Sequence, residues 1–125
     1  MKKIVLVLCA AFAVAAAVIT ASCMADTPEE RAIHAAKRAA EERGIVTGDA
    51  EIIYDPVSKR WEERVAAIES LPQDPNHGKL PHGVLYNKKF ETVLLDFKDD
   101  AKEADAWVFV NPDTGDVITV YQESR

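Results

Sequence analysis

Hydrophobic residues follow three different spacings along this chain of 125 residues. Residues 4–19 form an unbroken uncharged run. Two later stretches repeat apolar residues every three or four positions, as amphipathic helices do, and an alternating stretch lies between them. Beyond residue 90, short apolar stretches are separated by polar turns, as in antiparallel strands. The pattern predicts a leader segment followed by an α+β domain, in which one or two helices pack on an antiparallel sheet.

The first helix of this domain is predicted over residues 28–43. Thr27 can cap it, Pro28 suits the first helical position, and Glu30 completes a capping box. Gly44 is a good terminator because glycine adopts the left-handed conformation easily. His34 lies among charged neighbours and is predicted to be solvated. The apolar face is almost all alanine, which allows close approach to a sheet: Ala32, Ile33, Ala35, Ala36, Ala39 and Ala40.

A strand is predicted next, over residues 49–55, with Ala50, Ile52 and Tyr54 on one side. The apolar residues that follow, over 57–71, are spaced by four, four, three and three positions, which favours a helix. In that interpretation Asp55 caps the helix, Pro56 starts it and Pro72 ends it. The competing interpretation is a hairpin that turns at residues 57–59.

The rest of the chain is predicted to be a loop followed by a three-stranded meander. Residues 72–89 are irregular and rich in proline and glycine, with a short strand expected at 84–86. Pro112 and Gly115 mark a tight turn within the meander. The three strands are expected at residues 90–97, 106–110 and 116–121.

Both faces of this meander carry apolar residues, whereas an antiparallel sheet covered on one side usually has one polar face. Either helices and the 72–89 loop cover both sides, or one face is offered to a partner. We expect the face with Trp107 and Phe109 to be core. A binding surface is then expected on the opposite face or in the loop.

The first 22 residues have the features of an export signal peptide. Lys2 and Lys3 precede the apolar run, and the small residues Ala21 and Ser22 follow it. The run of about 16 residues is short for a helix that must span roughly 30 Å of hydrocarbon. The alternative is a permanent N-terminal anchor helix. The predicted organisation is a signal peptide over 1–22, a linker over 23–27 and a single domain over 28–125.

The segment Thr20, Ala21, Ser22 and Cys23 resembles the lipobox of bacterial lipoproteins, although Thr20 replaces the usual aliphatic residue. The resemblance implies that Cys23 carries a lipid. Cys9 would be removed with the signal peptide, so the mature chain would have no cysteine pair for a disulfide. Ordinary cleavage, after Cys23 or after Ala25, is the rival interpretation.

Charge narrows the class of partner. Residues 1–22 contain two lysines and no acid, so the remainder has 13 Lys and Arg against 21 Asp and Glu, a net charge of −8. Such a domain is expected to be repelled by nucleic acid and by anionic lipid head groups, so no nucleic-acid partner is expected. Contact with a membrane is expected through the lipid anchor only.

Candidate chemistry is sparse. His77 and His82 flank a glycine and a proline, and Asp74 lies close by, so these three side chains are the candidate metal ligands. The plainer interpretation is a polar loop without a metal, and we expect no cofactor. The chain has no G-x-S-x-G motif and no glycine-rich phosphate loop, so no catalytic residue is assigned.

Residues 107–118, with the sequence WVFVNPDTGDVI, are similar to the second half of PepSY-type domains, which are small exported modules. The alanine-rich helix followed by a strand also resembles the opening of that family, and a cystatin-like helix on a sheet is equally compatible. These resemblances imply binding or inhibition of another protein, without a catalytic residue. We therefore expect a non-enzymatic module that binds a protein or peptide at the cell envelope. The alternatives are a metal-dependent protein that uses residues 74–82 and a structural envelope lipoprotein.

Overall fold

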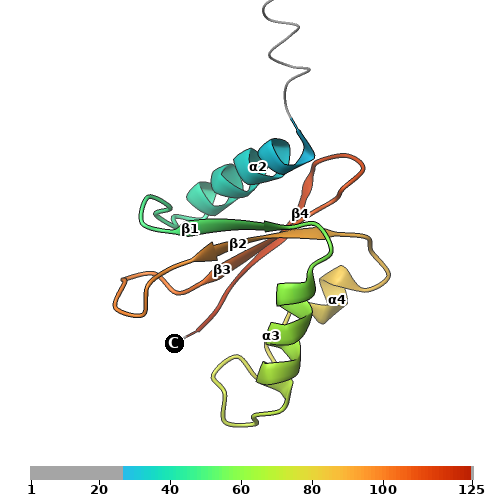
Figure 1. Ribbon diagram of the computed structural model, residues 1–125. Helices are drawn as coiled ribbons and strands as arrows, with labels where there is room; N and C mark the ends of the chain where they lie inside the picture. The colour runs from blue at the N-terminus through green and yellow to red at the C-terminus, as the bar shows by residue number, and fades with distance from the viewer. Residues whose placement is uncertain (1–26, 125) are drawn as a thin grey trace, which may run out of the picture.

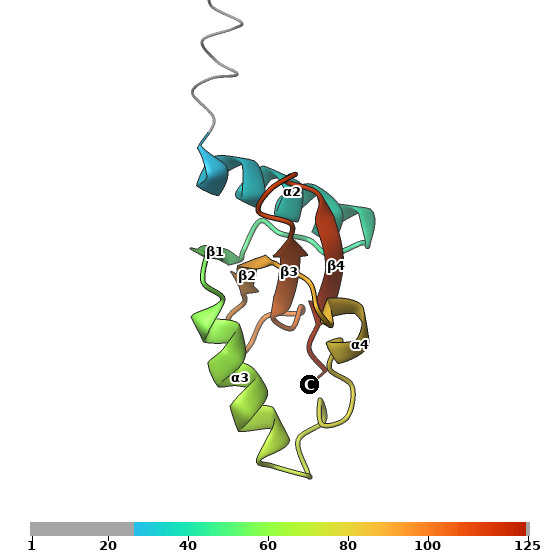
Figure 2. The ribbon, with the colours of Figure 1, turned by 90° about the vertical axis from the view of Figure 1, so that its right-hand side faces the viewer.

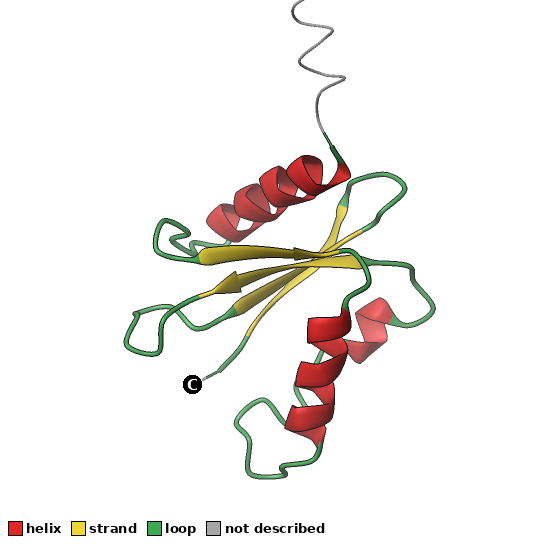
Figure 3. Ribbon diagram, viewed as in Figure 1, coloured by secondary structure: helices red, strands yellow, loops and turns green. Residues whose placement is uncertain are grey.

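A four-stranded antiparallel sheet forms the centre of the molecule, with helices on both of its faces (Figure 1 and Figure 3). The computed structural model describes residues 27–124, so the predicted signal peptide and Cys23 lie outside the described residues. The α+β class is confirmed. The elements in chain order are α2 (Pro28–Glu42), β1 (Glu51–Asp55), α3 (Lys59–Glu69), α4 (His82–Leu85), β2 (Glu91–Asp96), β3 (Ala106–Val110) and β4 (Val117–Gln122).

Helix α2 begins and ends as its sequence predicts. The Thr27 hydroxyl accepts a hydrogen bond from the backbone N–H of Glu30 at 3.1 Å, which satisfies one of the free donors of the first turn. At the other end Gly44 has φ +82°, and the N–H of Ile45 turns back to the carbonyl of Ala40 at 3.0 Å. The helix is therefore held at both ends by local interactions.

The strands lie in the order β1-β2-β3-β4, and every neighbouring pair is antiparallel. The β3–β4 turn is tight: the N–H of Gly115 donates to the carbonyl of Asn111 at 2.8 Å, and Gly115 has φ +79°. Strands β1 and β2 pair directly, although α3 and α4 lie between them in the chain. Residues 56–90 are therefore an insert between two adjacent strands, and we call them the insert.

The two faces of the sheet carry two separate cores. Figure 1 shows α2 above the sheet and α3 and α4 below it, and the view in Figure 2 agrees. The α2-side core consists of alanines, aliphatic residues and one phenylalanine: Ala32, Ala36, Ala40, Ile45, Val93, Leu95, Phe97, Ala106, Val108, Val110 and Val120. The insert-side core is mostly aromatic: Trp61, Leu85, Leu94, Trp107 and Phe109.

Both faces of the meander are therefore covered, and the expectation of a face left open for a partner is wrong. All residues of β3 and all but the last of β2 are buried. The placement of Trp107 and Phe109 in the core is confirmed. Of the two expected locations for a binding surface, only the 72–89 loop stays available.

The segment after β1 is a helix, so the hairpin interpretation is wrong, but the helix begins later than expected. Asp55 to Ser58 form a turn in which Ser58 has the left-handed φ of 56°, and α3 starts at Lys59. Asp55 still helps to cap the helix, because its carboxylate accepts the N–H of Arg60 at 2.9 Å. Val57, expected on the buried face, is 73% exposed because it lies in this turn.

The short strand expected at residues 84–86 is also wrong. His82–Leu85 form the one-turn helix α4, in which the N–H of Leu85 donates to the carbonyl of Pro81 at 3.2 Å. This turn brings Leu85 into the insert-side core, while Val84 and Tyr86 stay exposed. None of the four strands of the described sheet pairs with residues 84–86.

Candidate functional site

The residues proposed as metal ligands do not come together. Asp74 accepts hydrogen bonds from the backbone N–H and side-chain amide of Asn76, at 2.8 and 3.2 Å, and so closes a turn. His82 lies 3.5 Å from the carboxylate of Glu69, and His77 is exposed. Within residues 27–124, no three His, Cys, Asp or Glu side chains are grouped so as to hold a metal ion.

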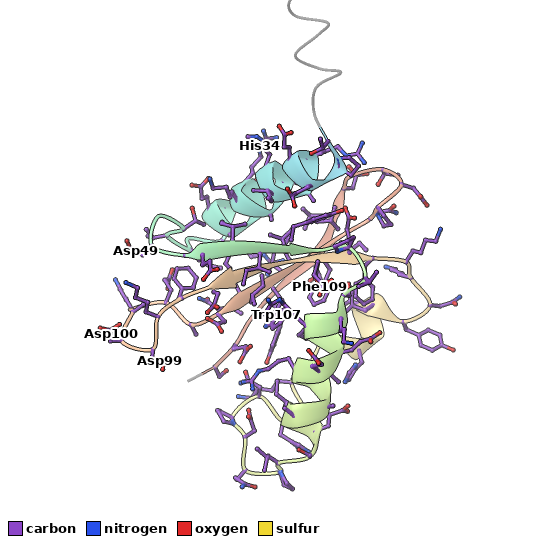
Figure 4. The ribbon with its side chains drawn as sticks, in the orientation of Figure 1. His34, Asp49, Asp99, Asp100, Trp107 and Phe109 are labelled. Carbon is purple, nitrogen blue, oxygen red and sulfur yellow. The ribbon has the colours of Figure 1, made fainter. Side chains whose placement is uncertain are left out.

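Aromatic rings fill the space between the insert and the sheet. Trp61 of α3 meets Trp107 and Phe109 of β3 edge to face, with ring centroids 5.1 and 4.8 Å apart. Edge-to-face contacts of this kind add to the stabilisation that burial provides. Figure 4 shows Trp107 and Phe109 in the interior, between the sheet and α3. These rings are therefore structural.

A buried carboxylate ties the insert to the C-terminal end of the chain. Glu123 accepts from the Arg64 guanidinium, with a shortest contact of 2.6 Å, and from the indole N–H of Trp107 at 2.8 Å. The hydrogen bond to Glu123 raises the pKa of Arg64 above its ordinary value, and burial opposes this only in part. Both partners hold the carboxylate in place, so these side chains act as a structural clasp. Water weakens the ion pair in it, because the Arg64 side chain is 36% exposed.

Asn76 makes a second connection between the insert and β4. Its side-chain oxygen accepts from the hydroxyl of Tyr121 at 2.7 Å and from the N–H of Ser124 at 2.6 Å. Its amide donates to the carbonyl of Ser124 at 3.3 Å. Burial raises the pKa of Tyr121, and the nearby carboxylates of Glu123 and Asp74 add to the shift. Asn76 is 1% exposed, so it is part of the interior.

A third polar pair lies on the α2 side. The Tyr54 hydroxyl donates to the buried carboxylate of Glu91 at 2.7 Å. Burial and this hydrogen bond raise the pKa of Tyr54 to about 12. The pair joins β1 to β2 beside the directly paired strand positions, so we interpret it as structural.

A cavity of about 310 Å³ adjoins the Glu123 clasp, between Arg64, Phe97 and Asp105. Its polar walls are part of the fold: the Asp105 carboxylate accepts the N–H of Phe97 at 2.8 Å, and its carbonyl accepts the N–H of Glu123 at 2.8 Å. Figure 4 shows Asp49, Asp99 and Asp100 at this end of the sheet. Among the described residues these carboxylates do not form a metal-binding group.

Exposed apolar side chains are concentrated in the insert. Residues 27–124 include five exposed large apolar residues, and of these only Val46 lies outside residues 56–90. Tyr86 is 81% exposed, at the end of α4. The others in the insert are Val57, Leu71 and Val84. Among residues 27–124, exposed large apolar side chains are therefore most frequent in the insert, both in the turn before α3 and around α4.

The sequence pattern missed the residues that organise the insert. Arg64, Asn76 and Glu123 each fit an ordinary polar helix, loop or tail. Their partners are 59 residues away for Arg64 and 48 for Asn76. A hint was available for Asn76 alone, because Asp74-Pro75-Asn76 has turn chemistry.

No protein-family model, curated protein sequence or solved structure matches this chain. The similarity to PepSY-type and cystatin-like modules therefore stays a prediction. Within residues 27–124, no helix has the length and apolar character needed to cross a membrane.

Proposed function

We propose that the protein is a non-enzymatic binding module of the cell envelope, and that it binds a protein or peptide through the insert. One observation carries the proposal: four of the five exposed large apolar side chains lie in residues 56–90, and Tyr86 among them is 81% exposed. Tyrosine is enriched in interface centres because it offers a large contact area and a polar end.

The rest of the described structure supports this assignment. Among residues 27–124, every buried side-chain nitrogen and oxygen has a hydrogen-bond partner, so the polar groups inside the fold are engaged in holding it together. Both sheet faces are covered by helices. The insert is the segment that adds apolar surface beyond what the core uses. Binding of another protein is also what the PepSY-like resemblance implies.

A capture experiment with matched variants tests the binding surface. Wild-type protein is used as bait in envelope extract, beside the double variant Tyr86→Ser, Val84→Ser and the control Val46→Ser, which changes an exposed valine outside the insert. We expect a specific partner with wild type and control, and its loss with the double variant. A partner that all three retain would place binding elsewhere. Capture of nothing by wild type would favour a purely structural lipoprotein.

The envelope location rests on Cys23 and has a separate test. If Cys23 is the lipid-attachment residue, the mature protein begins at a lipid-modified Cys23, and Cys23→Ala yields uncleaved precursor or soluble protein. Mass spectrometry of the mature N-terminus measures this directly. An unmodified mature N-terminus at Met24 or Asp26 would show ordinary signal cleavage.

A further inference from the structure

The middle of α2 is basic, although the chain as a whole is acidic. Its four glutamates are in the first and last turns, whereas residues 31–40 contain Arg31, His34, Lys37 and Arg38 and no acid. Arg31, His34 and Arg38 are spaced by three and four residues, which places them on one helix face. All four basic residues are exposed.

This face borders a groove of about 420 Å³ between α2 and the β3–β4 turn. Arg31, His34 and Arg38 line it together with Ala35 and Gly115. Arg31 and Arg38 supply the positive charge of this lining. Figure 4 shows His34 on the outer side of α2, away from the sheet. We call Arg31, His34 and Arg38 the basic groove.

Arg31 is held in position by the turn. Its Nη2 donates to the carbonyl of Pro112 at 3.4 Å. A Cβ at position 115 would lie 2.9 Å from Nε of Arg31, so the side chain fits because the residue there is glycine. A positioned guanidinium loses less freedom when it binds an anion than a fully flexible one.

The cations of the groove are not neutralised within the described structure. The ion pair of Arg64 with Glu123 and the contact of His82 with Glu69 both lie away from α2. Arg31 and Arg38 therefore carry charge without a carboxylate within 4 Å. Guanidinium groups suit phosphate because their planar donors match its oxygens.

The position of Cys23 indicates where such a phosphate would come from. Four residues lead from Cys23 to Thr27, and an extended chain spans at most about 3.6 Å per residue. A lipid on Cys23 would thus hold the start of α2 within roughly 15 Å of the bilayer surface. At that distance lipid head groups are present at high effective concentration.

We propose that the basic groove binds the phosphate of anionic phospholipid head groups, and so lays α2 against the membrane that carries the anchor. This rests on the lipid anchor of the proposed function. It replaces the expectation, drawn from the net charge of −8, that the membrane is contacted through the anchor alone, because the local charge of α2 differs from that of the whole domain. In this proposal the lipid on Cys23 attaches the protein to the membrane, and the basic groove sets the orientation of the domain on the membrane surface. Because α2 and the insert lie on opposite faces of the sheet, the insert is then presented away from the membrane (Figure 1 and Figure 2).

Energy transfer to labelled lipid tests the orientation. The full chain is expressed and exported, and the mature protein is reconstituted into phosphatidylcholine vesicles with or without phosphatidylglycerol. A donor dye is placed on Thr114→Cys, in the turn beside the groove, or on Gln73→Cys, in the insert. Phosphatidylglycerol should raise transfer from position 114 and lower it from position 73. Raised salt should reverse both changes, because salt screens exposed charges.

The charge variant Arg31→Gln, Arg38→Gln should remove this response while the protein still floats with the vesicles. Each basic residue near an anionic surface contributes roughly fivefold to binding. The control Lys88→Gln, Lys89→Gln removes the same charge from the insert and should keep the response. Circular dichroism checks that both variants are folded.

The other outcomes overturn the proposal. A response that survives Arg31→Gln, Arg38→Gln, or that the lysine control also loses, would mean that the basic groove is not the site. The same response to inorganic phosphate on neutral vesicles would make free phosphate the ligand. Protein that fails to float with neutral vesicles would refute the anchor itself, which separates that failure from failure of the groove.

Discussion

The two faces of the sheet are built from the same strands but are covered in different ways. On one face α2 packs through Ala32, Ala36 and Ala40, which are at most 1% exposed. On the other face the ring of Trp61, in α3, packs against the rings of Trp107 and Phe109, in β3. Small side chains let a helix lie close to a sheet, whereas large rings fill a wider space.

The helices on the two faces are held by contacts of different sequence separation. Helix α2 is capped at both ends by its own neighbours in sequence. The insert has few buried aliphatic residues, and it is held by contacts of Arg64 and Asn76 with the C-terminal end of the chain. Contacts between sequence neighbours define the helix on the α2 side. The insert side also needs polar partners that are distant in sequence.

The largest effect is expected on the aromatic face. Trp107→Ala removes the ring that meets Trp61 and the indole donor to Glu123, so it should cost about 3–5 kcal/mol of unfolding free energy. A domain of this size has only about 5–15 kcal/mol in total, so the variant should be close to unfolding. Thermal and urea unfolding measure this.

Trp107→Phe is the comparison variant, because it keeps one aromatic ring against Trp61 while it loses the N–H donor to Glu123 and part of the buried ring area. It should cost clearly less than Trp107→Ala. An unchanged melting temperature for Trp107→Ala would mean that this face is not buried in solution, and the comparison of two covered faces would fail.

The second largest loss of unfolding free energy is expected when the hydrogen bonds between Asn76 and the C-terminal end of the chain are removed. Asn76→Ala removes the buried side chain that accepts from Tyr121 and Ser124. The half-buried Tyr121 hydroxyl loses its partner, so the variant should cost about 1–3 kcal/mol. The exposed neighbour Gln73→Ala is the control and should change little. Hydrogen exchange should become faster in residues 70–80 of the Asn76 variant before it does in α2. Equal loss of protection in α2 would contradict two independently held faces.

A third test concerns how closely α2 packs against the sheet. Ala36 is fully buried between the helix and the sheet, so Ala36→Leu should cost about 1–3 kcal/mol through overpacking, although leucine is a good helix former. Lys37→Leu places the same side chain on the exposed side and should stay within about 0.5 kcal/mol. If Ala36→Leu were neutral or stabilising in urea unfolding, the α2 side would contain unfilled space.

Capping and turn residues close in sequence were enough to predict α2 and the β3–β4 turn. Thr27, Gly44 and the alanine spacing were sufficient for α2, and Pro112 with Gly115 for the β3–β4 turn.

The start of α3 could not be read in the same way, because it depends on a left-handed serine, a conformation without a clear sequence signal. Helix α4 was missed because Leu85 is recruited by a core made mainly of distant residues. The basic groove was missed for a related reason. His34 was interpreted among its helix neighbours, whereas the groove also needs Gly115, which lies 81 positions further along the chain.

The smallest effect is expected for the histidines of the insert. His77→Ala with His82→Ala should change the unfolding free energy by no more than about 0.5 kcal/mol, because both side chains are exposed and the contact of His82 with Glu69 is a surface pair. This is far less than the change at Asn76, one residue from His77, since Asn76 is buried and bonded to β4. Metal analysis of the purified protein supplies the second measurement. Stoichiometric zinc or copper that wild type retains and the double variant loses would show that the loop rearranges to bind metal, and the insert would then owe its order to an ion rather than to its polar contacts with β4.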